Sequence, residues 1–447
     1  MVTYLRRLVL WSMVAGVMAG VMAGGLSACQ SEAEVEPTPI IPADAVTYEQ
    51  VAPILARSCE SCHQMGGVAP FSLVGYENAS RFAAASKASV LSGNMPPLKV
   101  THDGSCQTFT DKRFLTAEEK QLLADWADSG ALRRDPTYQP PSTSRPPELS
   151  DESVTFEMPS SYSPKSSSGH PQDDYRCFFM EPALDRDQYL TGYEVLPGDR
   201  SMVHHVILMS LLEEDEATAA ELDAQDDRPG WDCVTGAGEG IPFYNVVMAW
   251  APGSDVERFP AGTGIKLRQG QRLVMQVHYN LTSTQGTDNT RLRLELTDSV
   301  DKQLRGLLPG PSEFELPPGQ PEYTIDYRIP LSKIQHRFQF MEGISFDSMT
   351  VYAAGSHMHL LGQEQRASVV PAGAAESSEK SCLIETKNFD FNWQLFFFYK
   401  EPVKVSMKDD LLLSCTYDTT SKDVPTYYGE GTEDEMCVTL LYVTFDE

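Results

Sequence analysis

The chain has 447 residues, too many for a single hydrophobic core, so roughly two to four domains are expected. Lysine and arginine together number 35 against 63 acidic residues, which gives a formal net charge of −28. This balance excludes nucleic acid as a partner, because binding to nucleic acid relies on basic side chains that neutralise phosphates. It would attract a cationic substrate or a basic redox partner, or simply keep an exported protein soluble.

The first 28 residues have the order of a secretory signal, with Arg6 and Arg7 followed by an apolar run and then LSAC. This ending resembles the lipobox of bacterial lipoproteins, which implies that Cys29 becomes the lipidated first residue. An uncleaved membrane anchor is the alternative. We therefore expect an exported protein, lipid-anchored in the bacterial cell envelope on the periplasmic side or the cell surface, with Gln30 favouring the outer membrane. That compartment is oxidising, so disulfides persist there.

An acidic, proline-rich stretch at 29–45 predicts a flexible tether from the membrane. Residues 46–132 then predict a small helical domain. TYEQVAPILARSC has helical apolar spacing, and TAEEKQLLADWADSGA opens with a capping-box pattern from Thr116 to Glu119. A Pro/Ser-rich linker follows at 133–152.

From residue 153 onward, short alternating apolar runs are separated by Gly, Pro, Asn and Asp, which is typical of all-β sandwiches. The length favours two sandwiches, at 153–302 and 303–447, with the break near LPGPSEFELPPGQPEY. The acidic run at 211–227 is expected to be a solvated insertion. The predicted fold is therefore multidomain: a small all-α domain followed by two all-β sandwiches.

The motif CESCH, residues 59–63, indicates covalent attachment of a c-type haem. Cys59 and Cys62 would form the thioethers, and His63 would be the proximal ligand. A zinc or redox CxxC is the alternative. The adjoining histidine, the exported compartment and the lack of a second CxxC favour haem. Residues 46–132 accordingly resemble a small cytochrome c domain.

A six-coordinate haem needs a second axial ligand from the opposite face of the ring. Met65 follows His63 too closely to reach that face. Met95, 32 residues after His63 in GNMPPL, is the predicted ligand, because a Met/His pair raises the reduction potential and suits electron transfer. His102 is the rival candidate.

Histidine is scarce, with nine in the chain, yet five of the nine lie in three strand-like motifs. One interpretation is that these five histidines are polar residues with no shared function. Their clustering favours a metal instead, since imidazole suits Zn, Cu, Fe or Ni. Neighbours on a regular strand face opposite ways, so an adjacent pair can share one ion only at a strand end or a bulge. The motifs are MVHHVILM, LVMQVHYN and GSHMHLLG, containing His204, His205, His278, His357 and His359.

The motifs VHHVIL, QVHYN, HMHL and DEMC occur in the order seen in copper type II, ascorbate-dependent monooxygenases, and the chain resembles that family over roughly residues 155–447. The family includes peptidylglycine α-hydroxylating monooxygenase and dopamine β-monooxygenase. The resemblance implies two jelly-roll-like sandwiches, each holding one copper ion. It assigns the electron-transfer site to His204, His205 and His278, and the oxygen-binding catalytic site to His357, His359 and Met436. A thioether beside two imidazoles favours Cu(I).

The resemblance also implies two disulfides. One joins Cys177 to Cys233 in the first sandwich, and the other joins Cys415 to Cys437 beside the methionine ligand. Cys106 and Cys382 receive no partner from it, and they would pair across domains or stay free.

Three positions compare this chain with the peptide-amidating members of the family. Gly355 stands where those members carry a substrate-binding arginine, and Leu440 stands where they carry a tyrosine. A peptide with a C-terminal glycine is therefore not an expected substrate, because the bidentate anchor for its carboxylate is missing. Gln276 matches the family.

The expected function is copper-dependent hydroxylation of a C–H bond in an unknown small organic substrate with O2. The fused haem would pass electrons to the three-histidine copper, in place of or in addition to ascorbate. A cytochrome, a quinol system or ascorbate would be the redox partner, and the lipid anchor would bind the membrane. The alternatives are a non-catalytic copper/haem redox or copper-binding lipoprotein, and an electron conduit whose β domains dock partners.

Overall fold

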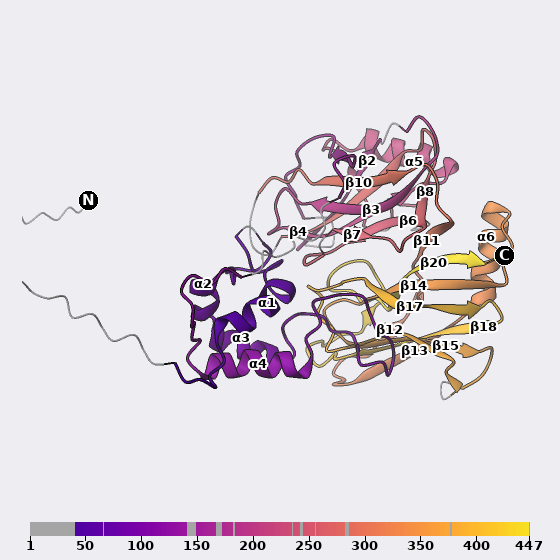
Figure 1. Ribbon diagram of the computed structural model, residues 1–447. Helices are drawn as coiled ribbons and strands as arrows, with labels where there is room; N and C mark the ends of the chain where they lie inside the picture. The colour runs from indigo at the N-terminus through magenta and orange to yellow at the C-terminus, as the bar shows by residue number, and fades with distance from the viewer. Residues whose placement is uncertain are drawn as a thin grey trace, which may run out of the picture. The chain divides into compact units, whose positions relative to one another are not determined.

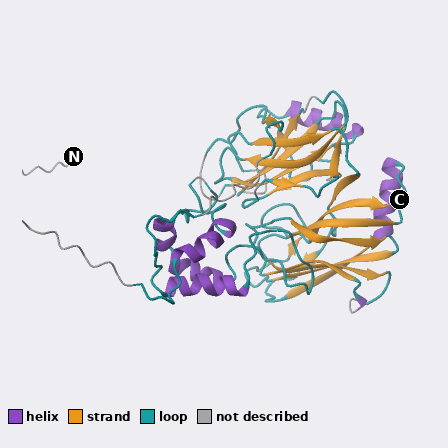
Figure 2. Cartoon of the chain, viewed as in Figure 1, coloured by secondary structure: helices purple, strands orange, loops and turns teal. Residues whose placement is uncertain are grey.

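Helices occupy the N-terminal part of the described chain and strands dominate the rest (Figures 1 and 2). The computed structural model describes residues 41–446 except 66, 141–148, 167–171, 182–183, 235, 242–244, 255, 282–285 and 376–377. The signal sequence, Cys29 and most of the tether lie outside these residues. No helix in the described ranges is both long and apolar enough to cross a membrane.

The helical part buries one face of each of its longer helices in a small core around Tyr48 and Trp126. The capping box is confirmed: Thr116 Oγ1 accepts a hydrogen bond from the Glu119 N–H (3.2 Å), and Glu119 accepts one from the Thr116 N–H (3.0 Å). Glu119 also pairs with Arg57 on the first helix, at 2.8 Å. The helices are α1 (Tyr48–Ser58), α2 (Tyr76–Arg81), α3 (Ala83–Leu91) and α4 (Ala117–Asp128).

Residues 98–114, here called the strap, differ from the all-α expectation. They run extended along the second sandwich, with bridges from Val100 to Thr386 and from Phe109 to Tyr399. Val100 and Phe109 are buried in the core of that sandwich. Apolar residues buried at such intervals, interrupted by glycine, suit an extended edge and not a helix.

The first β part contains two apolar clusters, one of them packed around Val206, Val277 and Leu292. Its sheet runs in the order β1-β10-β3-β8-β11-β6-β4-β9-β2-β5. The strands are β1 (Val154–Glu157), β2 (Asp173–Met180), β3 (Gln188–Leu196), β4 (Val203–Ser210), β5 (Trp231–Asp232), β6 (Asn245–Trp250), β7 (Glu257–Arg258), β8 (Thr263–Leu267), β9 (Leu273–Asn280), β10 (Arg291–Thr297) and β11 (Lys302–Leu307).

The second β part is a sandwich. The sheet β13-β18-β15-β16 and the strands β17, β14 and β20 pack their apolar faces together around residues such as Val351 and Leu413. The β-sandwich part of the predicted fold is thus confirmed. The strands are β12 (Glu315–Leu316), β13 (Tyr323–Pro330), β14 (Ser348–His357), β15 (Gly362–Pro371), β16 (Ser381–Lys387), β17 (Phe397–Ser406), β18 (Asp409–Tyr417), β19 (Thr426–Tyr427) and β20 (Val438–Asp446).

Strand β11 connects the two β parts at the predicted break. It pairs in parallel with β8, through Leu304 and Ile265, and antiparallel with β20, through Leu304 and Thr444. Backbone hydrogen bonds therefore continue from one β part into the other.

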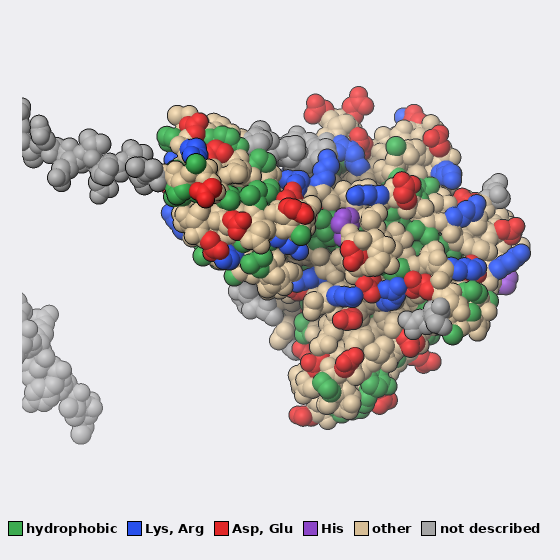
Figure 3. Space-filling view, turned by 60° about the horizontal axis from the view of Figure 1, so that its bottom comes forward, with side chains coloured by type: hydrophobic (Ala, Val, Ile, Leu, Met, Phe, Trp, Pro, Cys, Tyr) green, Lys and Arg blue, Asp and Glu red, His purple; other side chains and the backbone are tan. Residues whose placement is uncertain are grey.

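Two helices interrupt the strands. The acidic run forms α5 (Glu213–Gln225), which buries Ala219 and exposes Glu213, Glu214 and Glu221. The helix α6 (Leu331–Glu342) precedes β14. Acidic and basic side chains are interspersed on the face that Figure 3 shows, so the net charge is not gathered into one patch there.

Candidate metal and haem sites

A β-bulge in β4 allows the adjacent histidines His204 and His205 to face the same site. Strands β4 and β9 pair antiparallel, with Val203 opposite Tyr279 and His205 opposite His278, so His204 is the extra residue. A bulge bends the strand and re-aims its side chains. The ligand atoms of His204, His205 and His278 consequently lie within 4.8 Å of one another.

The ring of His278 is oriented by two residues of β2. Its Nε2–H faces the carboxylate of Asp173 (2.9 Å), and the ring stacks on Tyr175 at 4.0 Å between centroids. This leaves Nδ1 pointing at Nδ1 of His204 (3.2 Å) and Nδ1 of His205 (3.4 Å). Three imidazole nitrogens at such separations direct their lone pairs toward a common point, which fits a bound cation, and a carboxylate behind a ligand histidine is the usual support of a metal site.

Burial keeps the imidazoles of His204 and His205 neutral, the form that binds metal. Burial, with a further contribution from His357, lowers the pKa of His204 to about 4. Burial and the neighbouring His278 hold the pKa of His205 well below its ordinary value.

His357, His359 and Met436 meet where β14 ends and β20 begins, because His357 and Val438 are paired in the register of these strands. His357 Nδ1 is bonded to Gln394 Oε1, and its Nε2 faces Met436 Sδ at 3.1 Å. His359 Nδ1 donates to the Asp434 carbonyl (3.1 Å), and its ring centroid lies 5.2 Å from that of His357. Burial, followed by the effect of His357, lowers the pKa of His359 to about 3. Two neutral imidazoles and a thioether therefore gather at one place, a donor set that suits Cu(I).

The carboxylate of Glu435 holds both segments of this second site. It accepts hydrogen bonds from the backbone N–H groups of His359 (2.9 Å), Leu361 (2.6 Å) and Met436 (3.2 Å). Burial raises the pKa of Glu435 to about 7. One buried side chain thus fixes the HMH turn relative to the methionine.

Both sites border one cavity of about 560 Å³. The ring centroids of His205 and His357 are 6.5 Å apart, so the two donor sets face each other across a short gap. Phe391 lies between them, stacked on His204 at 4.3 Å and edge-on to His359 at 5.7 Å. Gly355 and Leu440, the two departures from the amidating members, both line this cavity.

The cavity wall carries one acidic side chain and, among the described lining residues, no lysine or arginine. The acidic residue is Glu430. Burial, together with the charge of Asp434, raises its pKa to about 8. Trp250, Phe396 and Tyr428 add aromatic surface to the wall. A carboxyl group in such a place suits a ligand that brings a positive charge on an apolar body.

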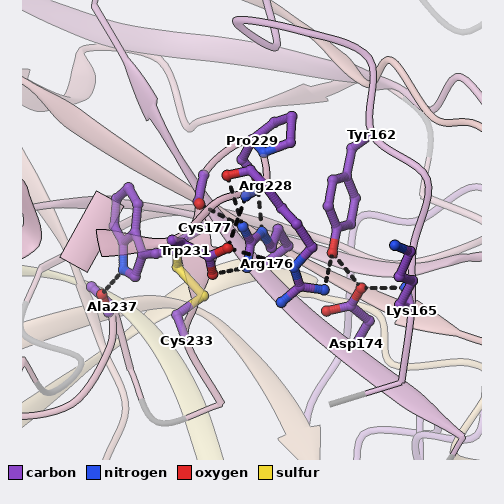
Figure 4. Close-up of polar contacts among 12 residues, drawn as sticks. Tyr162, Lys165, Asp174, Arg176, Cys177, Arg228, Pro229, Trp231, Cys233 and Ala237 are labelled. Carbon is purple, nitrogen blue, oxygen red and sulfur yellow. Dashed lines mark hydrogen bonds and ion pairs between the residues drawn. A yellow bond between two sulfur atoms is a disulfide. The ribbon is translucent and has the colours of Figure 1, made fainter. Parts of the chain in front are cut away.

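Hydrogen bonds hold the chain on both sides of β5, and Figure 4 shows those made by Arg176 and Trp231. The buried guanidinium of Arg176 donates to the carbonyls of Pro229 (2.8 Å) and Gly230 (2.5 Å). Trp231 Nε1 donates to the Ala237 carbonyl (2.7 Å), and Gln276 Nε2 donates to that of Gly236 (2.8 Å). These bonds fix a glycine-rich stretch whose backbone borders the cavity.

The structure contains three disulfides among the described cysteines. Cys177 is joined to Cys233, and Cys415 is joined to Cys437, next to Met436. The third joins Cys106 of the strap to Cys382 of β16. Sequence analysis left this last pair unassigned, because the two residues are 276 positions apart and no local pattern relates them.

The residues of the haem motif lie at the end of α1. Cys59 and Cys62 stand outside these disulfides. His63 is buried, and its Nδ1 donates to the Phe71 carbonyl (3.2 Å), which leaves Nε2 as the nitrogen for iron. A backbone carbonyl behind Nδ1 is how a ligand histidine is commonly held, so His63 fits a haem ligand.

The two candidates for the second axial ligand differ in their surroundings. Met95 is partly buried in the turn after α3, where its N–H donates to the Ser89 carbonyl (3.1 Å). His102 accepts the Phe109 N–H at Nδ1 (3.0 Å) and stacks on Phe114 at 3.8 Å, so it belongs to the strap. Met95 therefore stays the predicted ligand.

Sequence reasoning missed several supporting residues: Asp173, Tyr175, Gln394, Glu430 and Glu435. Three of these had a local signal, since Asp173 and Tyr175 lie in DDYRC with Cys177 and Glu435 lies inside DEMC. The others come from loops or strands with no distinctive pattern.

Comparison with known proteins identifies both β parts. The copper type II ascorbate-dependent monooxygenase N-terminal domain matches residues 163–285, and the C-terminal domain of the same family matches residues 312–445. DBH-like monooxygenase protein 1 of Homo sapiens is 26% identical over 279 residues, which are 60% of this chain and 42% of that protein. Its Gallus gallus counterpart is 30% identical, over 60% of this chain and 44% of that protein.

Dopamine beta-hydroxylase of Rattus norvegicus is 25% identical over 286 residues, which are 60% of this chain and 43% of that protein. The chain thus spans less than half the length of these relatives. The two domain matches together nevertheless cover more than half of the chain, and they contain all six candidate copper ligands. The chain therefore belongs to the copper type II ascorbate-dependent monooxygenase family.

Proposed function

We propose that this protein is a copper-dependent monooxygenase that hydroxylates a C–H bond of a small organic substrate with O2. The observation that carries the proposal is that a cluster of three imidazoles and a second group of two imidazoles and a thioether border the same cavity. In the overall reaction, one oxygen atom enters the C–H bond and the other leaves as water, with two electrons and two protons supplied by a reductant.

His204, His205 and His278 would hold one copper ion, and His357, His359 and Met436 would hold a second. Copper bound there would supply one-electron redox chemistry and O2 activation. The protein's own contribution is to fix the tautomers: Asp173, Gln394 and the Asp434 carbonyl each hold the distal N–H of a ligand histidine. The opposite nitrogens are thereby kept unprotonated toward the cavity.

The cavity favours a substrate that carries a positive charge. Glu430 lines a cavity whose wall is largely apolar and aromatic, and the described wall offers no lysine or arginine to balance its charge. A substrate amine would place an ammonium group beside this carboxylate and an apolar body against Trp250 and Phe396. Support for this choice comes from the rat relative, dopamine beta-hydroxylase, whose name specifies an amine substrate.

A c-type haem on Cys59 and Cys62, with His63 and Met95 as axial ligands, would feed electrons to the copper sites. A cytochrome, a quinol system or ascorbate would reduce that haem. Export and lipidation at Cys29 would place the protein in the cell envelope. The support for the haem is the CESCH motif and the orientation of His63.

The test compares the wild type with Met436→Ala. Metal analysis should count two copper ions and one haem iron per wild-type chain, and O2 consumption should be matched by a hydroxylated product. Met436→Ala should lose the product. If copper and haem are both bound but no panel of aryl or alkyl amines stimulates O2 consumption, the protein is a non-catalytic copper and haem redox protein instead.

A further inference from the structure

Two residues of β2 contact both the three-histidine site and the loop that precedes Met436. Asp173 and Tyr175 are two positions apart on a strand, so their side chains lie on the same face. Both support the His278 ring, Asp173 through its hydrogen bond to Nε2 and Tyr175 by stacking. They also reach the loop that precedes Met436.

The contacts to that loop are hydrogen bonds between the two β parts. Thr432 donates to Asp173 through Oγ1 (2.7 Å, to Oδ1) and through its backbone N–H (3.2 Å, to Oδ2). The Tyr175 hydroxyl donates to the Glu430 carbonyl (2.7 Å). We call Asp173, Tyr175 and Thr432 the clasp.

The three residues of the clasp are buried. Asp173, Tyr175 and Thr432 are 2–3% exposed, and His278 is fully buried. Hydrogen bonds in such surroundings are stronger than at a surface, and a member that loses its partner is left unsatisfied at high cost. These bonds therefore hold Asp173 and Tyr175 of β2 in a fixed position relative to the loop that contains Thr432.

The loop beyond the clasp leads directly to the second site. The Asp434 carboxylate accepts the Gly431 N–H (3.1 Å), while the Asp434 carbonyl accepts His359 Nδ1 (3.1 Å). Met436 is only four residues after Thr432 in the chain. A continuous run of contacts thus extends from the His278 ring to two ligands of the other site.

We propose that the clasp couples the two metal sites, with Asp173 and Thr432 as positioning residues. A metal on His278 Nδ1 fixes the ring proton on Nε2 and makes it a better donor to Asp173, which orients the carboxylate toward Thr432. Filling the three-histidine site therefore stiffens the loop 430–436 and holds the second donor set at the shared cavity. By reciprocity, an ordered second site strengthens metal binding at the first. The inference rests on the proposed function only in assuming that both sites bind copper.

The test uses the full chain with and without copper, and two readouts that do not depend on activity. Amide hydrogen exchange of residues 430–436 reports loop stiffness, and pulsed EPR of the Cu(II) form reports the separation of the ions. Thr432→Val removes the hydroxyl donor at nearly constant shape, and Thr432→Ser restores it. Thr324→Val is the matched control, because Thr324 is bonded to Thr416 on β18, away from both sites.

In the wild type, copper should slow exchange across 430–436. Thr432→Val should lose about tenfold to hundredfold of that protection, the range for one hydrogen bond to a charged group, and its Cu–Cu distance distribution should broaden. Thr432→Ser and Thr324→Val should behave like the wild type. Tyr175→Phe keeps the stacking and should show a smaller loss of protection in the same direction. This second variant tests the clasp if Thr432→Val fails to fold.

Copper-independent exchange of 430–436 in wild type that has bound both ions would overturn the clasp. So would wild-type protection and an unchanged Cu–Cu distance in Thr432→Val. If instead the clasp effects appear and no hydroxylated product forms with any amine, the proposed function fails and the clasp stands.

Discussion

Replacing Glu430 by glutamine removes a negative charge from the cavity while keeping the shape of the side chain. No ion pair to the Glu430 carboxylate is found in the described part of the chain. This carboxylate can therefore pair with the positive charge of a ligand. A charge-assisted hydrogen bond contributes about 1.5–3 kcal/mol. Loss of it should weaken the binding of a cationic ligand by roughly 10- to 150-fold.

The assay is calorimetric titration with an arylethylammonium probe, whose N–H groups can donate to the Glu430 carboxylate, and with its neutral propyl isostere. The wild type should bind the cation more tightly, and Glu430→Gln should bind both alike. Because the pKa of Glu430 lies at about 8, affinity for the cation should rise with pH through about 8 in the wild type and stay flat in the variant. Glu433→Gln is the control, since Glu433 is exposed and paired with Lys422.

Glu430→Gln should weaken the binding of a cation, but it should stabilise the fold at alkaline pH. The folded-state pKa of about 8 is above the ordinary value of 4.5, so Glu430 costs no stability below about 4.5. The cost grows as pH rises from about 4.5, where the unfolded chain ionises, and is complete above about 8, where the folded chain ionises too. Glu430→Gln should therefore melt at a higher temperature than wild type at pH 9 and at the same temperature at pH 4. Equal affinity of the wild type for the charged and neutral probes would refute the assignment of Glu430.

Three further predictions concern the metal, the haem and the strap. Met436→Ala should lower bound copper from two ions to about one per chain, measured by elemental analysis, whereas loss of both ions would show that the sites are not separable. Cys62→Ser should abolish the two-thioether haem signature in the pyridine haemochrome spectrum, and an unchanged spectrum would exclude Cys62 as an attachment site. Cys382→Ser, which frees Cys106, should lower the free energy of unfolding by about 2–4 kcal/mol in denaturant. An unchanged midpoint would mean that the strap is held by its other contacts alone.

The sequence by itself determined which side chains could bind metal and where helical patterns give way to strand patterns. Alternating apolar runs after residue 153 predict strands because side chains on a strand repeat every two residues, a purely local property. The capping box at Thr116 requires only four neighbouring residues, whereas the pairing of His357 with His359 depends on the turn that begins where β14 ends. The strand pattern and the capping box are readable because they depend on short-range spacing.

Only the tertiary structure decided how distant groups meet. The bulge that brings His204 alongside His205 depends on the register of β4 against β9, which no single strand specifies. The pairing of Cys106 with Cys382 depends on an extended strap inside a segment expected to be helical. Glu430 and Thr432 look like ordinary surface residues in the sequence. They become a cavity carboxylate and half of a clasp because packing of the two β parts removes water around them, and burial is a property of the whole fold.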